Sequence, residues 1–423
     1  MSLSAKFSCQ DDYDPNALSV DQARQFILGQ LAPMAARERV ALRSALGRVL
    51  AEDVIAPCNV PAHDNSAMDG FALRFADLEQ SAVSRLKVVG VALAGNAFDG
   101  SLRAGECVRI MTGAIPPPGT DTVVIQEVVQ TEGDFVLVPA GQRLGQNIRL
   151  AGEDLAIGQP AIAAGKLVRP AELGLMASLG FAEVSVKRRL RVAFFSTGDE
   201  LCSIGTPLAE GEVYDSNRYT LFGMLSRIGC DVIDMGVVRD DPALLEAAFS
   251  EAAANADVVI TSGGVSVGEA DFVKQLMAKM GEVLFWKIAM KPGRPMAFGR
   301  IGEAPHAAWL FGLPGNPVAV MATFYQFVRD ALYTLMGASP IPAVPLLPAT
   351  CVAPLKKFPG RTELQRGLLT SENGQWVVRP TGAQGSGILR SMSDANCLIV
   401  IEQDRGNVIA GETVQVQLFE GLV

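Results

Sequence analysis

Apolar and polar positions follow a regular alternation between about residues 188 and 338. Short apolar runs are separated there by longer segments with helical period, a pattern typical of a parallel sheet with crossover helices. The expected strands are 190–195, 230–235, 257–260 and 308–311, and the expected helices are 218–225, 242–254, 271–279 and 317–332. We therefore predict a central parallel α/β domain over residues 187–338, with ligands at the carboxyl ends of its strands.

The segment before this domain is less regular. An amphipathic helix is expected at 19–28, with Ser19 as its N-cap. After residue 60, Gly and Pro punctuate short β-like runs such as 87–93 and 121–125. We predict an irregular, strand-rich N-terminal region over residues 1–186.

The segment after the α/β domain is expected to be all β. A Pro-rich stretch at 339–348 cannot continue a helix and is interpreted as a linker. Strand-like runs follow at 363–368, 376–379, 397–401 and 413–419. They predict a small β-barrel or sandwich over residues 339–423. The fold class is therefore α/β plus β, in a multi-domain chain.

Composition narrows the possible functions. The 423 residues include 36 Lys and Arg against 45 Asp and Glu, a net charge of −9, which disfavours general nucleic-acid binding. The basic run at 187–191 is interpreted as a solvated segment where the chain enters the α/β domain. The two histidines, His63 and His306, are too few to favour Ser-His-Asp hydrolysis or His-ligated metal sites. Asp and Glu would hold any metal, which favours Mg²⁺.

The cysteines and the hydropathy indicate the compartment. Seven cysteines include no C-x-x-C pair, which argues against a disulfide framework and a thiolate zinc site. The N-terminal stretch has no apolar run, and no run elsewhere reaches the roughly 20 apolar residues that span a bilayer. We expect a cytoplasmic protein that is neither secreted nor inserted into a membrane.

Three strand-to-helix junctions carry small, Gly-rich or Pro-rich loops, at 196–200, 261–271 and 312–317. All three are expected on one edge of the sheet, where backbone N–H groups, hydroxyls and helix N-termini suit a phosphate. None matches the P-loop or the dinucleotide fingerprint. A tight turn explains any one of them equally well, but three on one edge favour a phosphorylated ligand.

Carboxylates stand beside these loops at Glu200, Asp240 and Asp271. Negative charge next to phosphate-binding amides is unfavourable unless a cation lies between them. Glu200 and Asp271 are therefore candidate Mg²⁺ ligands that bridge to phosphate oxygens. Helix N-capping is the alternative, and for Asp271 alone both interpretations stay open.

Three cations, Lys287, Lys291 and Arg294, interrupt the apolar stretch 285–296. Cations in a cleft need anionic partners, and the Arg294 guanidinium would add a bidentate fork. The stretch predicts a site for phosphate or another oxyanion, and a surface strand with solvated cations is the second interpretation.

The N-terminal region contributes further polar loops. Residues 64–70, which include Asp69, hold two carboxylates, an amide and a hydroxyl, and later loops offer Thr112 and Asp154. Asx-rich turns explain each loop in isolation. The loops gain weight only in combination.

In combination, these motifs resemble one family. They are similar, over nearly the whole chain, to the molybdopterin molybdenumtransferases of the MoeA type and to the E domain of gephyrin. The resemblance is carried by 64–70, 111–114, 152–154, 196–201, 215–217, 261–271, 291–295 and 312–317. One departure is Phe71, where Tyr is common.

The resemblance implies the last step of molybdenum cofactor assembly, in which molybdate enters the dithiolene of adenylylated molybdopterin and AMP is released with Mg²⁺ present. It implies Mg²⁺ ligands at Glu200 and Asp271. The candidate catalytic carboxylates are Asp69, Asp154, Glu200, Asp240 and Asp271. The candidate substrate-binding residues are Thr112, Ser196, Thr197, Gly263, Gly264, Ser266, Lys287, Pro314, Gly315, Asn316 and Pro317, with Lys291, Arg294, Arg366 and Ser386 at the molybdate pocket.

The resemblance also implies an elongated homodimer, in which Asp69, Thr112 and Asp154 would complete the pocket of the other subunit. The expected partners are a molybdopterin adenylyltransferase and molybdoenzyme apoproteins or their chaperones. Mg²⁺ and a helix N-terminus would stabilise the leaving AMP phosphate, a mechanism that needs no histidine.

Two alternatives stay open. A dimeric scaffold or carrier would bind the cofactor without turnover, and a related pterin-binding or adenylylating enzyme would use the α/β domain alone. The carboxylates Asp69, Asp154, Glu200 and Asp271 favour catalysis over a scaffold, and the flanking regions favour the full transferase. Molybdate and tungstate are not distinguished by the sequence, because both are tetrahedral oxyanions of similar charge.

Overall fold

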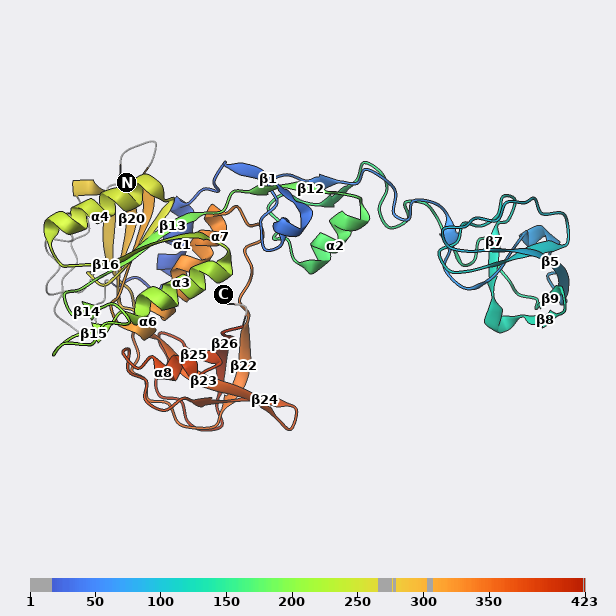
Figure 1. Ribbon diagram of the computed structural model, residues 1–423. Coiled ribbons are helices and arrows are strands. Elements are labelled where there is room, and N and C mark those ends of the chain that lie inside the picture. Colours follow the sequence, from blue (N-terminus) through green and yellow to red (C-terminus); the bar gives the residue numbers. More distant parts are fainter. Residues whose placement is uncertain (1–16, 265–275, 277–278, 303–306, 421, 423) are drawn as a thin grey trace.

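The computed structural model describes residues 17–264, 276, 279–302, 307–420 and 422. Figure 1 shows three regions: a central sheet with its helices, a small barrel beside it, and an arm that extends away from both. The central region carries most of the predicted site residues.

A six-stranded sheet forms the central region. Its strands, in the order β16-β13-β17-β21-β20-β18, are Asp231–Val238, Arg191–Thr197, Val258–Ser262, Ala308–Leu313, Pro295–Ile301 and Gly281–Lys287. The first four are parallel, which confirms the predicted parallel α/β arrangement. β20 is antiparallel to both β21 and β18, so β18 ends at the same edge as the parallel strands.

β18 and β20 are absent from the sequence prediction, and they make the sheet mixed. The cations and the Pro-Gly turn within 285–296 interrupt the apolar pattern there. The hydropathy of this stretch therefore does not predict the end of one strand and the start of the next. The structure places the end of β18 and the start of β20 on either side of that turn.

Helices cover both faces of the sheet. The helices are α1 (Val20–Gln30), α3 (Ser216–Ile228), α4 (Pro242–Asn255), α6 (Pro317–Thr323), a π-helical turn at Phe324–Val328 and α7 (Arg329–Leu335). On β13, Val192 and Phe194 pack with α1, α3 and α6, whereas Ala193 and Phe195 pack with α4. Both faces are therefore buried, as expected for a parallel sheet. The predicted helix at 271–279 lies almost wholly outside the described residues.

α1 confirms the predicted helix and its N-cap. Ser19 Oγ accepts from the Gln22 N–H at 3.2 Å, and Gln22 Oε1 accepts from the Ser19 N–H at 2.9 Å, a capping box. Just before the helix, the Leu18 N–H donates to the Lys287 carbonyl at 3.1 Å. α1 thus belongs spatially to the central sheet. No helix in the described ranges is long and apolar enough to cross a membrane.

The arm is an antiparallel ribbon that ends in a separate sheet (Figure 1). Along the ribbon, β1 (Arg37–Ala41) pairs with β12 (Glu183–Lys187), β2 (Val54–Ile55) with β11 (Pro160–Ile162), and β3 (Asn65–Ser66) with β10 (Ile148–Arg149). α2 (Pro170–Ser178) packs beside the β1–β12 pair. The distal sheet, ordered β7-β4-β6-β5-β9-β8, consists of Thr122–Ile125, Gly70–Leu73, Glu106–Ile110, Ser84–Ala92, Phe135–Val138 and Gln130–Glu132.

The C-terminal barrel is closed, so of the two predicted all-β forms the barrel is confirmed. Its strands are β22 (Leu346–Cys351), β23 (Thr362–Glu372), β24 (Gln375–Pro380), β25 (Cys397–Ile401) and β26 (Thr413–Leu418), and α8 (Arg390–Ser393) precedes β25. β23 pairs with both β24 and β25, which closes the ring. β19 (Met290–Lys291) of the central region adds to β23 in parallel.

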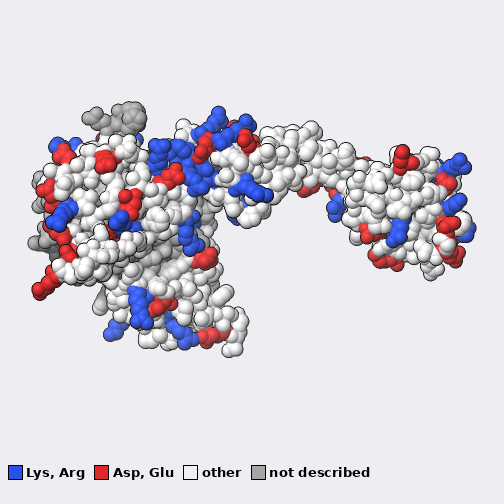
Figure 2. Space-filling model, viewed as in Figure 1, with Lys and Arg blue, Asp and Glu red and all other residues white. Residues whose placement is uncertain are grey.

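Lysine and arginine side chains gather over the β1–β12 part of the arm (Figure 2). Where the arm meets the central region, both Arg188 Nη atoms donate to the Asp257 carboxylate, at 2.9 and 3.1 Å. Lys187 Nζ donates to the Met34 carbonyl at 3.0 Å. The basic run at 187–191 therefore ties the arm to the central region.

Candidate functional site

The first predicted loop, 196–200, leaves the carboxyl end of β13. Gly198 has a φ of +149°, and a Cβ atom there would lie 2.5 Å from a carboxylate oxygen of Glu200. The positive φ favours glycine at this point, and the absence of a Cβ atom leaves room for that carboxylate. Glu200 is exposed, and the chain continues into β14 (Leu201–Cys202), which pairs with β15 (Val213–Tyr214).

The loops after β13, β17 and β21 touch one another. A Cβ atom on Gly263, whose φ is +95°, would lie 2.5 Å from the Thr197 carbonyl oxygen. The Gly263 N–H donates to the Leu313 carbonyl at 3.1 Å. A Cβ atom on Gly315 would lie 3.8 Å from Gly263 Cα. The structure therefore brings the described parts of the three loops, including Gly264, to one edge of the sheet.

The N-terminus of α3 meets this edge. Asp215 Oδ1 caps the helix by accepting from the Arg218 N–H at 3.2 Å. Asn217 Nδ2 donates to Ser262 Oγ at 2.7 Å and to the Gly315 carbonyl at 2.6 Å. Asn217 thus joins α3, β17 and the loop after β21. The sequence includes 215–217 among its motifs without assigning a role, and an Asp N-cap before an apolar helix is the only local signal.

Five buried oxygen atoms at this edge have no hydrogen-bond partner in the described structure. They are Ser196 Oγ, Thr197 Oγ1, Asp215 Oδ2, Asn217 Oδ1 and Thr261 Oγ1. Buried polar atoms are normally paired, and leaving one unpaired costs about 1–3 kcal/mol. The three hydroxyl groups among them can donate to phosphate oxygens, so the edge has the donor set of a polar, anionic ligand site.

Next to this edge lies a cavity of about 250 Å³ between the central region and the barrel. The predicted site residues that line it are Lys291, Arg294, Pro314, Gly315, Asn316 and Ser386. The Val318 N–H donates to the Ser386 carbonyl at 3.0 Å, which holds the barrel loop against the start of α6. Residues from two domains therefore meet in one cavity.

Arg361 and Gln384 also line this cavity, and the sequence does not predict either. Each is a single polar residue in a region read as strands and turns, so no spacing or motif marks it.

Lys291 is paired across the two domains. Its Nζ atom lies 3.0 Å from Glu363 Oε1, and the Glu363 side chain is only 5% exposed. Gln365 Nε2 donates to the other carboxylate oxygen at 2.9 Å. The backbones of Lys291 and Glu363 also pair, between β19 and β23. The Lys291 side chain, 53% exposed, therefore lies between a buried carboxylate and the cavity.

Arg366 is buried, with 1% of its surface exposed, in an adjoining cavity of about 320 Å³. Its Nε atom donates to Ser391 Oγ at 2.9 Å and its Nη2 atom to the Gly385 carbonyl at 2.9 Å. Its backbone N–H donates to Gln384 Oε1 at 2.7 Å. Burial lowers the pKa of Arg366. In this structure Arg366 supports the loop that carries Ser386.

The remaining central candidates lie at the same sheet edge where they are described. Lys287 ends β18. Asp240 follows β16, and its N–H donates to Asp199 Oδ1 at 3.3 Å, beside the loop of Glu200. Pro317 begins α6. Ser266 and Asp271 lie outside the described residues.

Asp69, Thr112 and Asp154 lie on the arm. Asp69 precedes β4 and Thr112 follows β6, in the distal sheet. Asp69 Oδ1 accepts from the Thr112 N–H at 2.7 Å and from its hydroxyl at 2.8 Å, and these bonds lower the pKa of Asp69. The Asp154 N–H donates to the Val60 carbonyl at 3.1 Å on the ribbon. Within one chain the distal sheet is far from β13 and β14 (Figure 1), and Glu200 lies in the loop between these two strands.

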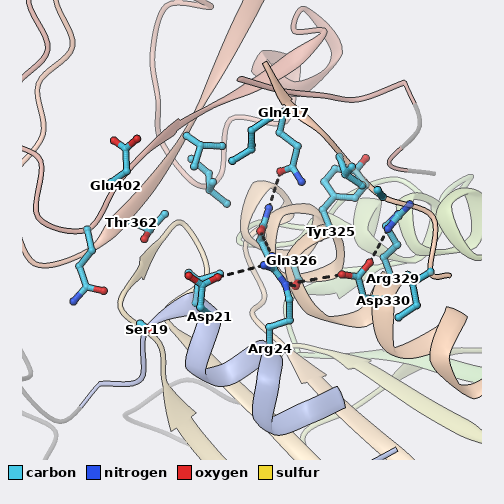
Figure 3. A pocket seen from close by; sticks show the side chains of 18 of the residues that line it. Ser19, Asp21, Arg24, Tyr325, Gln326, Arg329, Asp330, Thr362, Glu402 and Gln417 are labelled. Carbon is cyan, nitrogen blue, oxygen red and sulfur yellow. Dashed lines mark hydrogen bonds and ion pairs between the residues drawn. The ribbon is translucent and has the colours of Figure 1, made fainter. Parts of the chain in front are cut away.

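A larger cavity, of about 520 Å³, lies between α1, the π-helical turn and the barrel (Figure 3). Its polar side chains bind one another: Arg24 Nη2 donates to Gln326 Oε1, and Gln326 Nε2 donates to Gln417 Oε1, both at 2.8 Å. None of the predicted site residues lines it. We therefore place the candidate site at the sheet edge, where buried donors are unpaired.

The described residues hold no group of three or more His, Cys, Asp or Glu side chains that would bind a metal ion alone. Glu200 stands exposed beside the unpaired hydroxyl groups. A Mg²⁺ ion at this position would share its coordination with ligand oxygens, which is its usual behaviour at phosphate sites. The edge therefore fits Mg²⁺ together with a phosphate, rather than Mg²⁺ in an all-protein cage.

Three family models match the chain in order. They describe the MoeA N-terminal region (domain I and II), over residues 18–180, a probable molybdopterin binding domain, over 193–334, and the MoeA C-terminal region (domain IV), over 348–419.

Relatives of known name cover almost the whole chain. The molybdopterin molybdenumtransferase of Haemophilus influenzae is 46% identical over 408 residues, 96% of this chain and 100% of the relative. Molybdopterin molybdenumtransferase 2 of Mycobacterium tuberculosis is 37% identical, over 93% of this chain and 98% of the relative. The crystal structure of a molybdopterin biosynthesis moeA protein from Pyrococcus horikoshii OT3 has a TM-score of 0.82 at 29% identity, covering 96% of this chain and 100% of that one. The predicted class, a transferase of molybdenum cofactor biosynthesis, is thus confirmed at the level of the family: the chain belongs to the MoeA family of molybdopterin molybdenumtransferases.

Proposed function

We propose that this chain inserts molybdate into adenylylated molybdopterin and releases AMP in the presence of Mg²⁺. The observation that carries the proposal is the cluster of unpaired buried oxygens at the ends of β13 and β17, beside a cavity lined by cations. Neighbouring sites of this kind suit a phosphorylated ligand and an oxyanion. The relatives are named molybdopterin molybdenumtransferases, which supports molybdopterin and molybdenum as the groups that are joined.

The pyrophosphate of the substrate would lie over the carboxyl ends of β13 and β17. The hydroxyl groups of Ser196 and Thr197 and the backbone N–H group of Gly264 would donate to it. Gly263, whose own N–H is held by the Leu313 carbonyl, would leave room for the phosphate to approach the backbone closely. Ser266 and the turn Pro314, Gly315, Asn316 and Pro317 would bind the rest of the nucleotide. These fixed donors would stabilise the charge that develops on the AMP phosphate as the phosphoanhydride bond breaks.

Glu200 and Asp271 would hold Mg²⁺, with phosphate oxygens as its other ligands. When bound, the ion supplies neutralisation of the phosphate charge that these two carboxylates would otherwise repel. Asp240 and Lys287, at the same edge, would adjust the local charge around the nucleotide.

Molybdate would occupy the cavity lined by Lys291, Arg294 and Ser386. The guanidinium of Arg294 can donate to two oxygens of a dianion at once, and the Lys291 ammonium, which also contacts Glu363, can add a further donor. Arg366 would act on this pocket through the loop that it supports.

A second subunit would complete the site. Asp69, Thr112 and Asp154 lie on the arm. The arm extends away from β13 and β14 of its own chain, so a homodimer would let the arm of one subunit reach the sheet edge of the other. The substrate would come from a molybdopterin adenylyltransferase, and the product would pass to molybdoenzyme apoproteins or their chaperones.

The test is AMP release from adenylylated molybdopterin by the full chain with Mg²⁺, with and without molybdate. We expect molybdate to stimulate release. Glu200→Gln and Asp271→Asn should each lower the stimulated rate by on the order of 10²-fold, because charge stabilisation at the leaving phosphate is lost.

Glu251→Gln is the matched control, since Glu251 is exposed on α4 and its side chain makes no hydrogen bond or ion pair with the other described residues. It should leave the rate unchanged. Tight substrate binding without any molybdate-dependent release would reject the transferase proposal and favour a carrier or scaffold.

A further inference from the structure

We propose that Arg361 binds the oxyanion directly and is the second guanidinium of the cavity that holds Lys291 and Arg294. The proposal deepens the function proposed above and rests on its oxyanion pocket. Arg361 lines that cavity of about 250 Å³ together with Asn316 and Ser386.

Two nearby cations besides Arg294, namely Lys291 and Arg366, are already engaged by the protein. Lys291 contacts the buried Glu363 carboxylate at 3.0 Å, so its charge is largely compensated before any ligand arrives. The Nε and Nη2 atoms of Arg366 donate to Ser391 Oγ and the Gly385 carbonyl. A dianion in the cavity therefore needs a further positive group.

Arg361 is placed to supply that group. In the described part of the chain its guanidinium makes no hydrogen bond and no ion pair, and the side chain is only partly exposed. Its backbone is nevertheless held on both sides. The Gly360 N–H donates to the Gln403 carbonyl at 2.8 Å, and the Thr362 N–H donates to the Ala289 carbonyl at 2.9 Å. The backbone on either side of Arg361 is therefore fixed, while the guanidinium donors stay available to a ligand.

The chemistry of the ligand follows from this group. A planar guanidinium presents two parallel N–H donors that match two oxygens of a tetrahedral oxyanion. The predicted ligand class is a tetrahedral dianion such as molybdate. Lysine at this position would keep the charge but lose the fork, so the two contributions can be separated.

The experiment measures molybdate binding to the full chain by isothermal titration calorimetry, without adenylylated molybdopterin. We expect Arg361→Ala to weaken binding about tenfold or more and Arg361→Lys to weaken it less. The melting temperature should not change, because the guanidinium has no partner among the residues that the structure describes. Arg379→Ala is the matched control: Arg379 is a half-exposed barrel arginine paired with Glu372, and its loss should leave molybdate binding as in the wild type.

Unchanged molybdate affinity in Arg361→Ala would overturn the proposal, and so would a loss that accompanies unfolding and is not relieved in Arg361→Lys. AMP release is measured in parallel on the same proteins. Arg361-dependent binding without AMP release would reject the transferase proposal and leave this inference standing. Molybdate-dependent release that is indifferent to Arg361 would do the opposite.

Discussion

Lys357 is a buried cation that organises the base of the barrel. Its Nζ atom donates to the carbonyl oxygens of Glu402, Gln403 and Arg405 at 2.6, 2.7 and 2.5 Å, and burial lowers its pKa. We predict that Lys357→Met lowers the free energy of unfolding of the barrel by about 2–4 kcal/mol, because three carbonyls lose a charged donor. Differential scanning calorimetry measures the effect.

Lys356→Met is the control for this prediction. Lys356 is the exposed neighbour, and a surface substitution of this kind is expected to stay within about 0.5 kcal/mol. An equal decrease in the free energy of unfolding in both variants would mean that the three hydrogen bonds from Lys357 to backbone carbonyls do not stabilise the barrel.

At the scale of residues, prediction from sequence succeeds where chemistry is local. Glu200 follows a strand and a glycine, so the loop pattern brings it to the sheet edge. Arg361 and Glu363 carry no such mark, because their significance depends on the cavity and on Lys291, 72 residues away from Glu363. Asn217 likewise reaches Gly315, 98 residues away. Spacing along the chain contains no information on such pairs.

At the scale of elements, Asn217 fixes the start of α3 against the end of β17 and the loop after β21. Asn217→Ala would remove the donor to Ser262 Oγ and to the Gly315 carbonyl. We predict a loss of about 1–3 kcal/mol in the free energy of unfolding, together with weaker AMP binding, since the loops no longer share one anchor. Chemical denaturation and calorimetric titration of AMP measure the two effects.

Asn255→Ala removes an amide of the same kind from the exposed C-terminal end of α4, where Asn255 Nδ2 donates only to the Glu251 carbonyl at 2.9 Å. It should leave AMP binding intact. Loss of AMP affinity in Asn255→Ala as well would assign the effect to general destabilisation.

Elements were predictable in proportion to their burial. β13 and β17 are buried on both faces and read as continuous apolar runs. β8 is exposed throughout and three residues long, and β3 and β10 have two residues each, so neither hydropathy nor alternation reveals them. The order of the distal sheet depends on pairings between such short pieces, and the sequence carries no register for them.

At the scale of the whole molecule, the separation of the arm from the sheet edge predicts complementation between subunits. Asp69→Asn and Glu200→Gln should each inactivate the homodimer. After co-refolding in equal amounts, heterodimers should contain one intact site and one doubly damaged site. We expect about a quarter of wild-type AMP release, because random pairing makes half of the dimers mixed and half of their sites intact.

If a verified heterodimer stays inactive, the proposal that Asp69 of one subunit completes the site of Glu200 in the other subunit is wrong. Co-refolded Asp69→Asn with Asp154→Asn supplies the control, since both changes lie on the arm and a mixed dimer would restore no site that needs both.

The distal sheet is an insertion that is connected to the rest of the chain through one pair of short strands. Asn65 pairs with Arg149 and Ser66 with Ile148, so residues 67–147 leave and return at one antiparallel pair. A two-residue turn is enough to close such a pair. Residues 67–147 could therefore be replaced by a short turn without a change of register in the strand pairs of the ribbon. Asp69 and Thr112 lie within the excised segment, whereas Asp154 lies outside it. Excision at this pair would therefore remove Asp69 and Thr112 and leave the central region and the barrel in the chain.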